Sequence, residues 1–261
     1  MSKVRIAIQF HPQHAEYDAI RDAVSRAEAM GVDIAYNWDH FYPLYGEPDG
    51  EHFECWTMLA AWAEQTSTIQ IGPLVTCNSY RNPQLLADMA RTVDHISGGR
   101  LIFGIGSGWF ERDYDEYGYE FGTAGSRLKD LKRDLPIIKE RWSKLNPPPT
   151  RELPILIGGG GEKVTLRLVA EHAHVWHYFG SPETMGPKLE ILRGHCEAVG
   201  RDYDEIEKSV GIDWEKVSEA APLGDQFYDL GFRQFTFGAN GPDFNIDFVQ
   251  EWLDWRDEKN R

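Results

Sequence analysis

The stretch LPILIGGGGEKVTLRLVAEHAHVWHYF, residues 153–179, contains one complete strand–helix–strand pattern. The apolar run 153–159 predicts a strand, and apolar residues at helical spacing over 162–172 predict a helix directly behind the glycines. A second apolar run, 173–179, predicts another strand. Two strands joined by a helix typically lie parallel in one sheet, so this stretch indicates an α/β fold.

The same alternation continues along the chain on both sides of this stretch. Further strands are expected at 4–10, 33–38, 68–77, 100–106, 206–212 and 232–238. Further helices are expected at 15–30, 55–65, 83–97, 126–144, 183–199, 214–221 and 243–258. Eight such pairs predict a TIM-like (β/α)8 barrel that forms one domain over residues 1–261. A doubly wound sheet is the alternative, but such sheets usually stop at about five or six strands.

Composition limits the classes of partner and compartment. The net charge of −15, from 27 Lys+Arg against 42 Asp+Glu, disfavours nucleic acid and anionic lipid as partners. No apolar run approaches the roughly 20 residues of a membrane span, and the first residues do not resemble a signal peptide. The three cysteines are far apart, which argues against a disulfide framework. We therefore expect a cytoplasmic protein that acts on a small molecule.

Two glycine-rich segments follow expected strands, and in a barrel this is the end where function lies. The run GIGSGW, residues 104–109, lacks the G-x-G-x-x-G spacing of a dinucleotide-binding loop, and Trp109 stands where that pattern needs glycine. The run Gly158, Gly159, Gly160 and Gly161 leaves a strand and precedes a helix. Its backbone N–H groups could converge on a phosphate, although a tight turn is the alternative.

Polar residues at other strand ends give candidate catalytic and metal-binding groups. Asp39 and His40 end the second strand and, as neighbours on a strand, should point to opposite faces. His172 and His174 resemble a metal pair of barrel hydrolases, but they come before their strand rather than after it. His177 alone reaches the functional end, and we count it with the candidates for ligand binding. The acidic residues between 107 and 125 predict a solvated or substrate-facing loop.

Together, the segments WDHF, GPLVTCNSYRNPQLLADMARTVDHISGGRLIFGIGSGWFERDYDEYG and PILIGGGGEKVTLRLVAEHAHVWH resemble the luciferase-like monooxygenase superfamily, in particular its deazaflavin-dependent branch. The resemblance implies a barrel that holds a deazaflavin (coenzyme F-420) or FMN in its mouth. It also implies a non-prolyl cis peptide bond between Leu74 and Val75, behind the cofactor ring. By the same resemblance the cofactor-binding residues are Asp39, Leu74, Val75, Thr76, Asn78, Gly106, Ser107, Gly108, Trp109, Gly158, Gly159, Gly160, Gly161 and His177.

The resemblance also separates possible activities. Sugar-phosphate dehydrogenases of the superfamily keep a catalytic glutamate where this chain has Trp109, so sugar-phosphate oxidation is not expected. The interpretation that we adopt is a coenzyme F-420-dependent oxidoreductase with Asp39 and His40 as catalytic residues and no metal. Basic residues near the mouth would favour the anionic tail of that coenzyme; the candidates are Arg81, Arg112 and Arg127. An FMN-dependent monooxygenase or reductase and a metal-dependent barrel hydrolase are the alternatives, and a homodimer is compatible with the resemblance.

Overall fold

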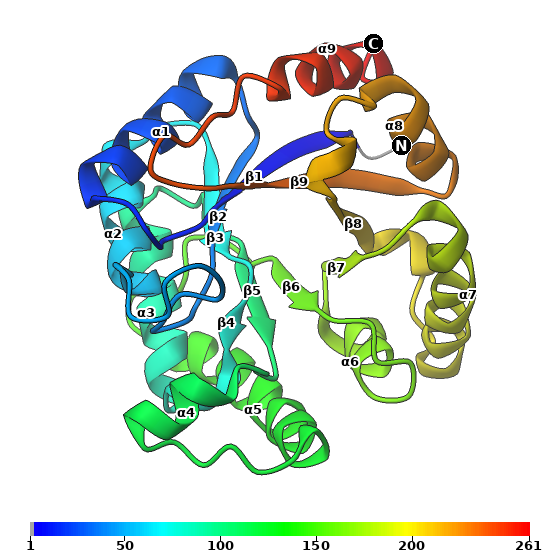
Figure 1. Cartoon of the computed structure of the whole chain (residues 1–261). Helices are drawn as coiled ribbons and strands as arrows, with labels where there is room; N and C mark the ends of the chain where they lie inside the picture. The colour runs from blue at the N-terminus through cyan, green and yellow to red at the C-terminus, as the bar shows by residue number, and fades with distance from the viewer. Residues whose placement is uncertain (1–2) are drawn as a thin grey trace.

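The computed structural model describes residues 3–261, and in it the parallel strands form a barrel with helices around the outside (Figure 1). The strands are β1 (Arg5–Phe10), β2 (Ile34–Asn37), β3 (Gln70–Pro73), β4 (Thr76–Cys77), β5 (Phe103–Gly106), β6 (Ile155–Gly158), β7 (Val175–Phe179), β8 (Glu207–Ile212) and β9 (Phe232–Ala239). The strand from the start of the chain, β1, lies beside the last one, β9, with Ile6 opposite Phe235. The predicted TIM-like barrel is confirmed.

The expected third strand, 68–77, is interrupted, and this break gives the barrel one more strand than predicted. Strand β3 pairs with β2, whereas β4 pairs with β5, and the two pieces are separated by a cis peptide bond between Leu74 and Val75. The sheet closes here, because the N–H of Ile71 donates to the carbonyl of Arg100 and the N–H of Ile102 donates to the carbonyl of Ile71. Strands β3 and β4 therefore share one of eight positions around the barrel.

The helices that cover the strands are α1 (Tyr17–Met30), α2 (Cys55–Gln65), α3 (Pro83–Ile96), α4 (Glu111–Tyr117), α5 (Ala124–Lys144), α6 (Thr165–His172), α7 (Pro182–Val199), α8 (Ala220–Asp229) and α9 (Val249–Lys259). Short 3-10 turns lie at Asn78–Tyr80, Tyr203–Glu205 and Trp214–Lys216. Helix α3 begins where expected, because the side chain of Asn82 accepts from the N–H groups of Gln84 and Leu85 ahead of the first turn.

Four helix predictions differ from the structure. The helix expected at 214–221 is a 3-10 turn at Trp214–Lys216 followed by α8, which begins at Ala220 and ends at Asp229. Helix α4 lies inside the segment that we expected to be a loop, and Gly118 ends it in the left-handed conformation with a φ of 69°. Helix α6 begins at Thr165 rather than directly behind the glycines, and α9 begins at Val249 rather than at 243. Residues 162–164 form a turn, so the run Gly158–Gly161 does not open a helix.

The apolar core lies mainly between the strands and the helices, with a smaller cluster inside the barrel. The inner cluster consists of Ala7, Ile34, Tyr36, Leu74, Ile102, Leu156 and Val175. Since all strands run parallel, their carboxyl ends meet at one rim, and this is where a TIM barrel places its site. Within residues 3–261, the helices are too short or too polar to cross a membrane.

Candidate active site

A cavity of about 630 Å³ opens at the carboxyl ends of the strands, within the range typical of small-molecule sites. Its lining is mostly apolar and aromatic. The residues expected at the site that line it are Asp39, His40, Leu74, Val75, Gly106, Ser107, Gly108, Trp109, Gly158, Gly159 and His177. The barrel thus brings together residues that are separated by up to 138 positions in the sequence.

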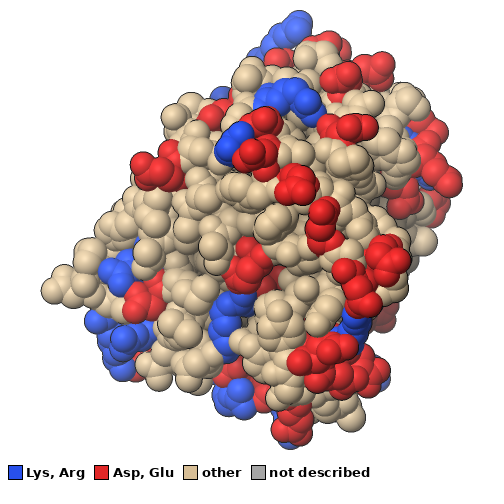
Figure 2. Space-filling view, turned by 60° about the vertical axis from the view of Figure 1, so that its left-hand side comes forward, with Lys and Arg blue, Asp and Glu red and all other residues tan. Residues whose placement is uncertain are grey.

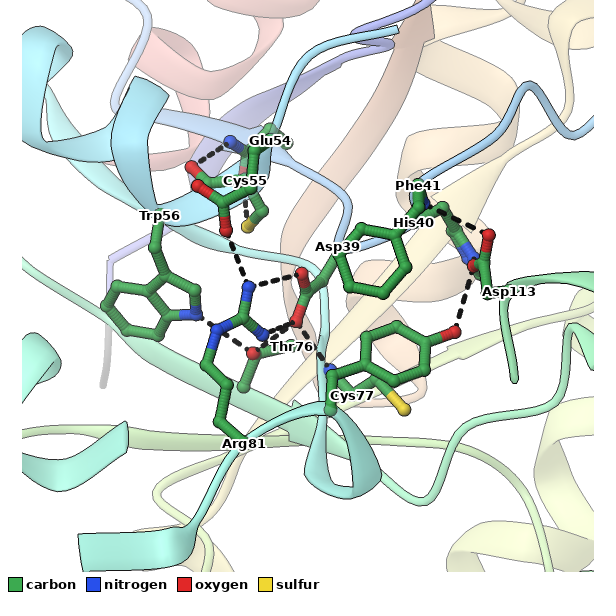
Figure 3. Close-up of polar contacts among 12 residues, drawn as sticks. Asp39, His40, Phe41, Glu54, Cys55, Trp56, Thr76, Cys77, Arg81 and Asp113 are labelled. Carbon is green, nitrogen blue, oxygen red and sulfur yellow. Dashed lines mark hydrogen bonds and ion pairs between the residues drawn. The ribbon is translucent and has the colours of Figure 1, made fainter. Parts of the chain in front are cut away.

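Asp39 is held by a set of protein donors (Figure 3). Its Oδ2 accepts from the hydroxyl of Thr76 at 2.6 Å and from the N–H of Cys77 at 3.0 Å. Arg81 donates to both carboxylate oxygens, at 2.6 and 3.0 Å, and also to Glu54. The side chain of Asp39 is fully buried. With four donors it supports the broken strand, and it has little capacity left to bind a ligand.

His40 has a different environment from its neighbour. Its Nδ1 lies 2.7 Å from Oδ2 of Asp113, whose side chain is fully buried. Since the carboxylate can only accept, Nδ1 carries the proton, and the other nitrogen, Nε2, has no protein partner among residues 3–261. The edges of Trp109 and Phe110 pack against the imidazole, with ring centroids 5.7 and 5.5 Å away. An imidazole held in one orientation in this way is chemically able to serve as a general base or acid.

Asp113 is the residue that sequence reasoning missed. We expected it to belong to a solvated or substrate-facing loop, but it accepts from His40, from the hydroxyl of Tyr80 and from the N–H of Phe41 (Figure 3). It projects inward because α4 replaces the expected loop and turns one face toward the barrel. Asp113 and Tyr114 are the buried residues of this helix, and two adjacent buried residues in so acidic a segment give little helical pattern to detect.

The glycines at the rim leave room for Val75. A Cβ on Gly106 would lie 2.7 Å from a methyl group of Val75, and one on Gly158 would lie 3.0 Å from the other methyl group. The cis bond expected from the resemblance is present, and the side chain that follows it occupies the space that these glycines provide. Gly106 and Gly158 are therefore needed to seat the broken strand against β5 and β6.

Four of the expected residues do not line the cavity. Thr76 donates to Asp39 and accepts from Trp56, while Asn78 donates to Asp134 behind the rim. Gly160 and Gly161 follow the lining glycines Gly158 and Gly159 in the chain but do not line the cavity themselves. Among residues 3–261, no group accepts a hydrogen bond from the N–H of Gly160 or Gly161, so both donors remain available to an anion.

The three arginines expected near the mouth are already engaged by the protein. Arg81 binds Asp39 and Glu54; burial acts to lower its pKa, but the two carboxylates outweigh this and raise it overall. Arg112 pairs with Asp49, and Arg127 donates to the carbonyls of Gly108 and Phe121. Of the described residues that line the cavity, none is lysine or arginine. The described lining therefore offers an anionic ligand no lysine or arginine side chain.

The histidines considered as a metal pair lie at the opposite rim. Nδ1 of His174 accepts a hydrogen bond from the N–H of Ile155. His172 is the last residue of α6. Neither lines the rim cavity. Residues 3–261 contain no cluster of three or more His, Cys, Asp or Glu side chains that could hold a metal ion.

Comparison with known proteins places this architecture in a family. Residues 2–213 match the family described as luciferase-like monooxygenase, which is more than half of the chain. The chain belongs to the luciferase-like monooxygenase family. The resemblance stated from the sequence motifs is thereby confirmed, and the family is one of enzymes.

Relatives similar to this chain differ in the activity that their names state. The F-420-dependent glucose-6-phosphate dehydrogenase of Amycolatopsis mediterranei is 31% identical over 177 residues, which cover 60% of this chain and 51% of that protein. The pyrimidine monooxygenase RutA of Stutzerimonas stutzeri is 25% identical over 232 residues, covering 76% of this chain and 64% of that protein. The chain thus spans between half and two thirds of the length of these two relatives.

Solved structures of other proteins share the fold. An F-420-dependent secondary alcohol dehydrogenase in complex with an F-420–acetone adduct superposes with a TM-score of 0.85 at 18% identity, covering 98% of this chain and 99% of that chain. The EDTA monooxygenase from Chelativorans sp. BNC1 gives a TM-score of 0.79 at 12% identity, covering 99% and 95%. At these identities the likeness is one of fold.

Proposed function

We propose that the chain is a coenzyme F-420-dependent oxidoreductase that moves a hydride between the cofactor and a small organic substrate. The observation that carries this proposal is the His40–Asp113 pair. His40 lines the cavity, and its second ring nitrogen, Nε2, has no partner among the described residues. The 2.7 Å contact of Nδ1, the burial of Asp113 and the edge-on aromatic rings all hold the imidazole in one orientation. A relative named as an F-420-dependent dehydrogenase supports the choice of cofactor.

The residues present are suited to a planar cofactor with a phosphate. Val75 would support one face of the ring, and Trp38, Trp109 and Ile212 supply apolar walls. The unengaged N–H groups of Gly160 and Gly161 would bind phosphate oxygens at the rim. When bound, the deazaflavin supplies the acceptor or donor of the hydride.

His40 would handle the proton that accompanies the hydride. When an alcohol is oxidised, the C–H hydrogen leaves with its electron pair and the O–H proton leaves separately. Nε2 of His40 accepts that proton, and Asp113 stabilises the imidazolium that results. In the reverse direction the imidazolium returns the proton to the oxygen. Asp39 acts as a positioning residue, because its carboxylate is already occupied by four donors.

An FMN-dependent monooxygenase or reductase is the second candidate. It is favoured by the absence of lysine and arginine among the described lining residues, since FMN lacks the long anionic tail of coenzyme F-420. The relatives named as monooxygenases agree with it.

A calorimetric titration of the protein with each cofactor tests the choice. We expect binding of oxidised coenzyme F-420 at least tenfold tighter than binding of FMN. Reduced coenzyme would then be screened for reoxidation by ketones, activated alkenes, imines and quinones. Tighter binding of FMN would overturn the deazaflavin assignment, and binding of neither would overturn both candidates.

The role of His40 is tested by Asp113→Asn, with Asp115→Asn as the matched control because Asp115 is exposed on the same helix. We expect Asp113→Asn to lower kcat roughly 10- to 100-fold, since an asparagine orients the ring less firmly and does not stabilise the imidazolium. The cofactor Kd should stay within twofold of the wild-type value. An equal loss in cofactor affinity would mean that Asp113 only maintains the structure.

A further inference from the structure

A ladder of polar side chains crosses the inside of the barrel below the cavity. His177 on β7, Ser209 on β8 and Gln234 on β9 are direct partners on neighbouring strands. Nε2 of Gln234 donates to Oγ of Ser209 at 2.9 Å, and Oγ of Ser209 lies 2.8 Å from Nδ1 of His177. All three residues are buried, so an unmet donor or acceptor among them is costly.

The direction of each hydrogen bond in the ladder is set from its far end. Arg5, which can only donate, gives a hydrogen bond to Oε1 of Gln234 at 3.2 Å and is itself paired with Glu207. This contact fixes the amide of Gln234 with Nε2 toward Ser209. The hydroxyl oxygen of Ser209 accepts there, and the one acceptor that its hydrogen reaches among residues 3–261 is Nδ1 of His177. Nδ1 of His177 is therefore the unprotonated nitrogen.

The other nitrogen of His177 has no partner. Its Nε2 is buried, makes no hydrogen bond within the described chain, and belongs to a residue on the cavity wall. Burial lowers the pKa of His177 to about 3, so the ring is neutral at physiological pH. A neutral imidazole with an accepting Nδ1 carries its proton on Nε2.

We propose that His177 is a ligand-recognition residue: the Arg5–Gln234–Ser209 ladder fixes it as the Nε2–H form, and this N–H donates to a carbonyl oxygen or an unprotonated ring nitrogen of the molecule bound at the floor of the cavity. The proposal rests on the function given above, since it deepens the role of the same cavity. A planar cofactor ring and a carbonyl substrate both carry such acceptors. A ligand with an N–H or O–H at this position would meet a second donor and bind poorly.

The protonation form of His177 is tested without any ligand. Protein with nitrogen-15-labelled histidine would be studied by NMR at pH 7.5, and the signals of His177 would be assigned by their loss in His177→Gln. We expect the neutral Nε2–H form in the wild type and a shift toward the Nδ1–H form in Ser209→Ala, because that variant removes the donor to Nδ1. An Nδ1–H or charged ring in the wild type would overturn the proposal.

Binding of oxidised coenzyme F-420 and of FMN tests the recognition role. His177→Leu, which removes the donor, should weaken the affinity about tenfold, whereas His177→Gln, which offers an amide N–H, should recover most of it. The control is His95→Gln, at an exposed residue of α3, and this variant should bind as the wild type does. Melting temperatures of all variants separate a loss of recognition from a loss of folding.

The outcomes also separate the two sources of the acceptor. Weaker cofactor binding in His177→Leu assigns the acceptor to the cofactor. Unchanged cofactor binding with a tenfold higher KM for a ketone assigns it to the substrate. Unchanged values for both would overturn the recognition role. If the wild type binds neither cofactor, the proposed function fails, while the NMR result still decides whether the ladder fixes His177.

Discussion

Asp39 and His40 are adjacent in the sequence but serve separate partners on two sides of one strand end. Asp39 turns toward Arg81, 42 positions away, and His40 turns toward Asp113, 73 positions away. The alternation of side chains along a strand predicts that the two point apart, and it predicts no more than this. Arg81 lies just before α3 and Asp113 lies in α4, so the division into a supporting carboxylate and an imidazole with one unpaired nitrogen depends on tertiary packing.

The ion pair between Arg81 and Asp39 should contribute far more to the free energy of unfolding than the contact between Arg81 and Glu54. In Arg81→Met the fully buried carboxylate of Asp39 loses its counter-charge, which should lower the free energy of unfolding by about 3–5 kcal/mol. Glu54 is 37% exposed at its side chain, so Glu54→Gln should cost no more than about 1 kcal/mol. Urea denaturation measures the free energy of unfolding of both variants. Equal losses would show that the buried carboxylate of Asp39 does not need Arg81 as its counter-charge.

His177 should make folding stability depend on pH. Its pKa is about 3 in the folded protein and about 6.5 in the unfolded chain, so between these values the unfolded chain binds a proton that the folded protein does not. Stability from this group is complete above about pH 6.5 and falls as pH decreases, by at most about 1.4 kcal/mol per pH unit. Urea denaturation at pH 7.5 and 5.0 should show a smaller loss for His177→Gln than for the wild type. Equal losses of stability in His177→Gln and in the wild type would contradict this prediction.

At the scale of elements, the departures from regular secondary structure build the site. The interrupted strand β3–β4 brings Val75 to the cavity, and α4 brings Asp113 to His40. The break was expected only from the family resemblance, because the apolar run 68–77 reads as one strand. Helix α4 was not expected at all, since its segment is acidic and aromatic without a clear apolar face. Regular elements were predictable from periodicity, and these two depend on their surroundings.

Two glycines in different elements should respond in opposite ways to alanine. A Cβ on Gly104 in β5 would lie 2.0 Å from the carbonyl oxygen of Pro73, so Gly104→Ala should destabilise the barrel by about 3 kcal/mol or more. Gly194 in α7 is exposed with nothing within 4 Å, and Gly194→Ala should stabilise the protein by about 0.5–1 kcal/mol. Thermal denaturation compares the two, and a stable Gly104→Ala would show that the seam between β3 and β5 can open.

The architecture of the whole molecule was predictable because the barrel repeats one local pattern eight times. Each strand–helix pair has its own periodicity, and the count alone separated the barrel from a doubly wound sheet. The electrostatic character of the cavity was not predictable in this way. Arginines that looked available in the sequence are engaged by carboxylates and carbonyls, and which of them remain free is decided only when all elements pack together.

The charge of the molecule should select against anionic substrates. Acidic side chains form several clusters on the face seen in Figure 2, the net charge is −15, and the described lining of the cavity has no lysine or arginine. For a substrate alcohol and its phosphate ester, we expect kcat/KM to be at least tenfold lower for the ester. The gap should narrow between 50 and 500 mM salt, because salt screens the repulsion. A preference for the ester would instead require a cationic subsite outside the lining.

Three of the nine tryptophans, Trp38, Trp109 and Trp214, line the cavity, and the last two are 62% and 56% exposed at its mouth. Indole emission responds to nearby rings and to loss of water. The protein therefore carries its own optical reporter of occupancy: a bound aromatic ligand should quench its intrinsic fluorescence, and Trp109→Phe should remove part of that response. Unlabelled compound collections could be screened in this way before any substrate is known.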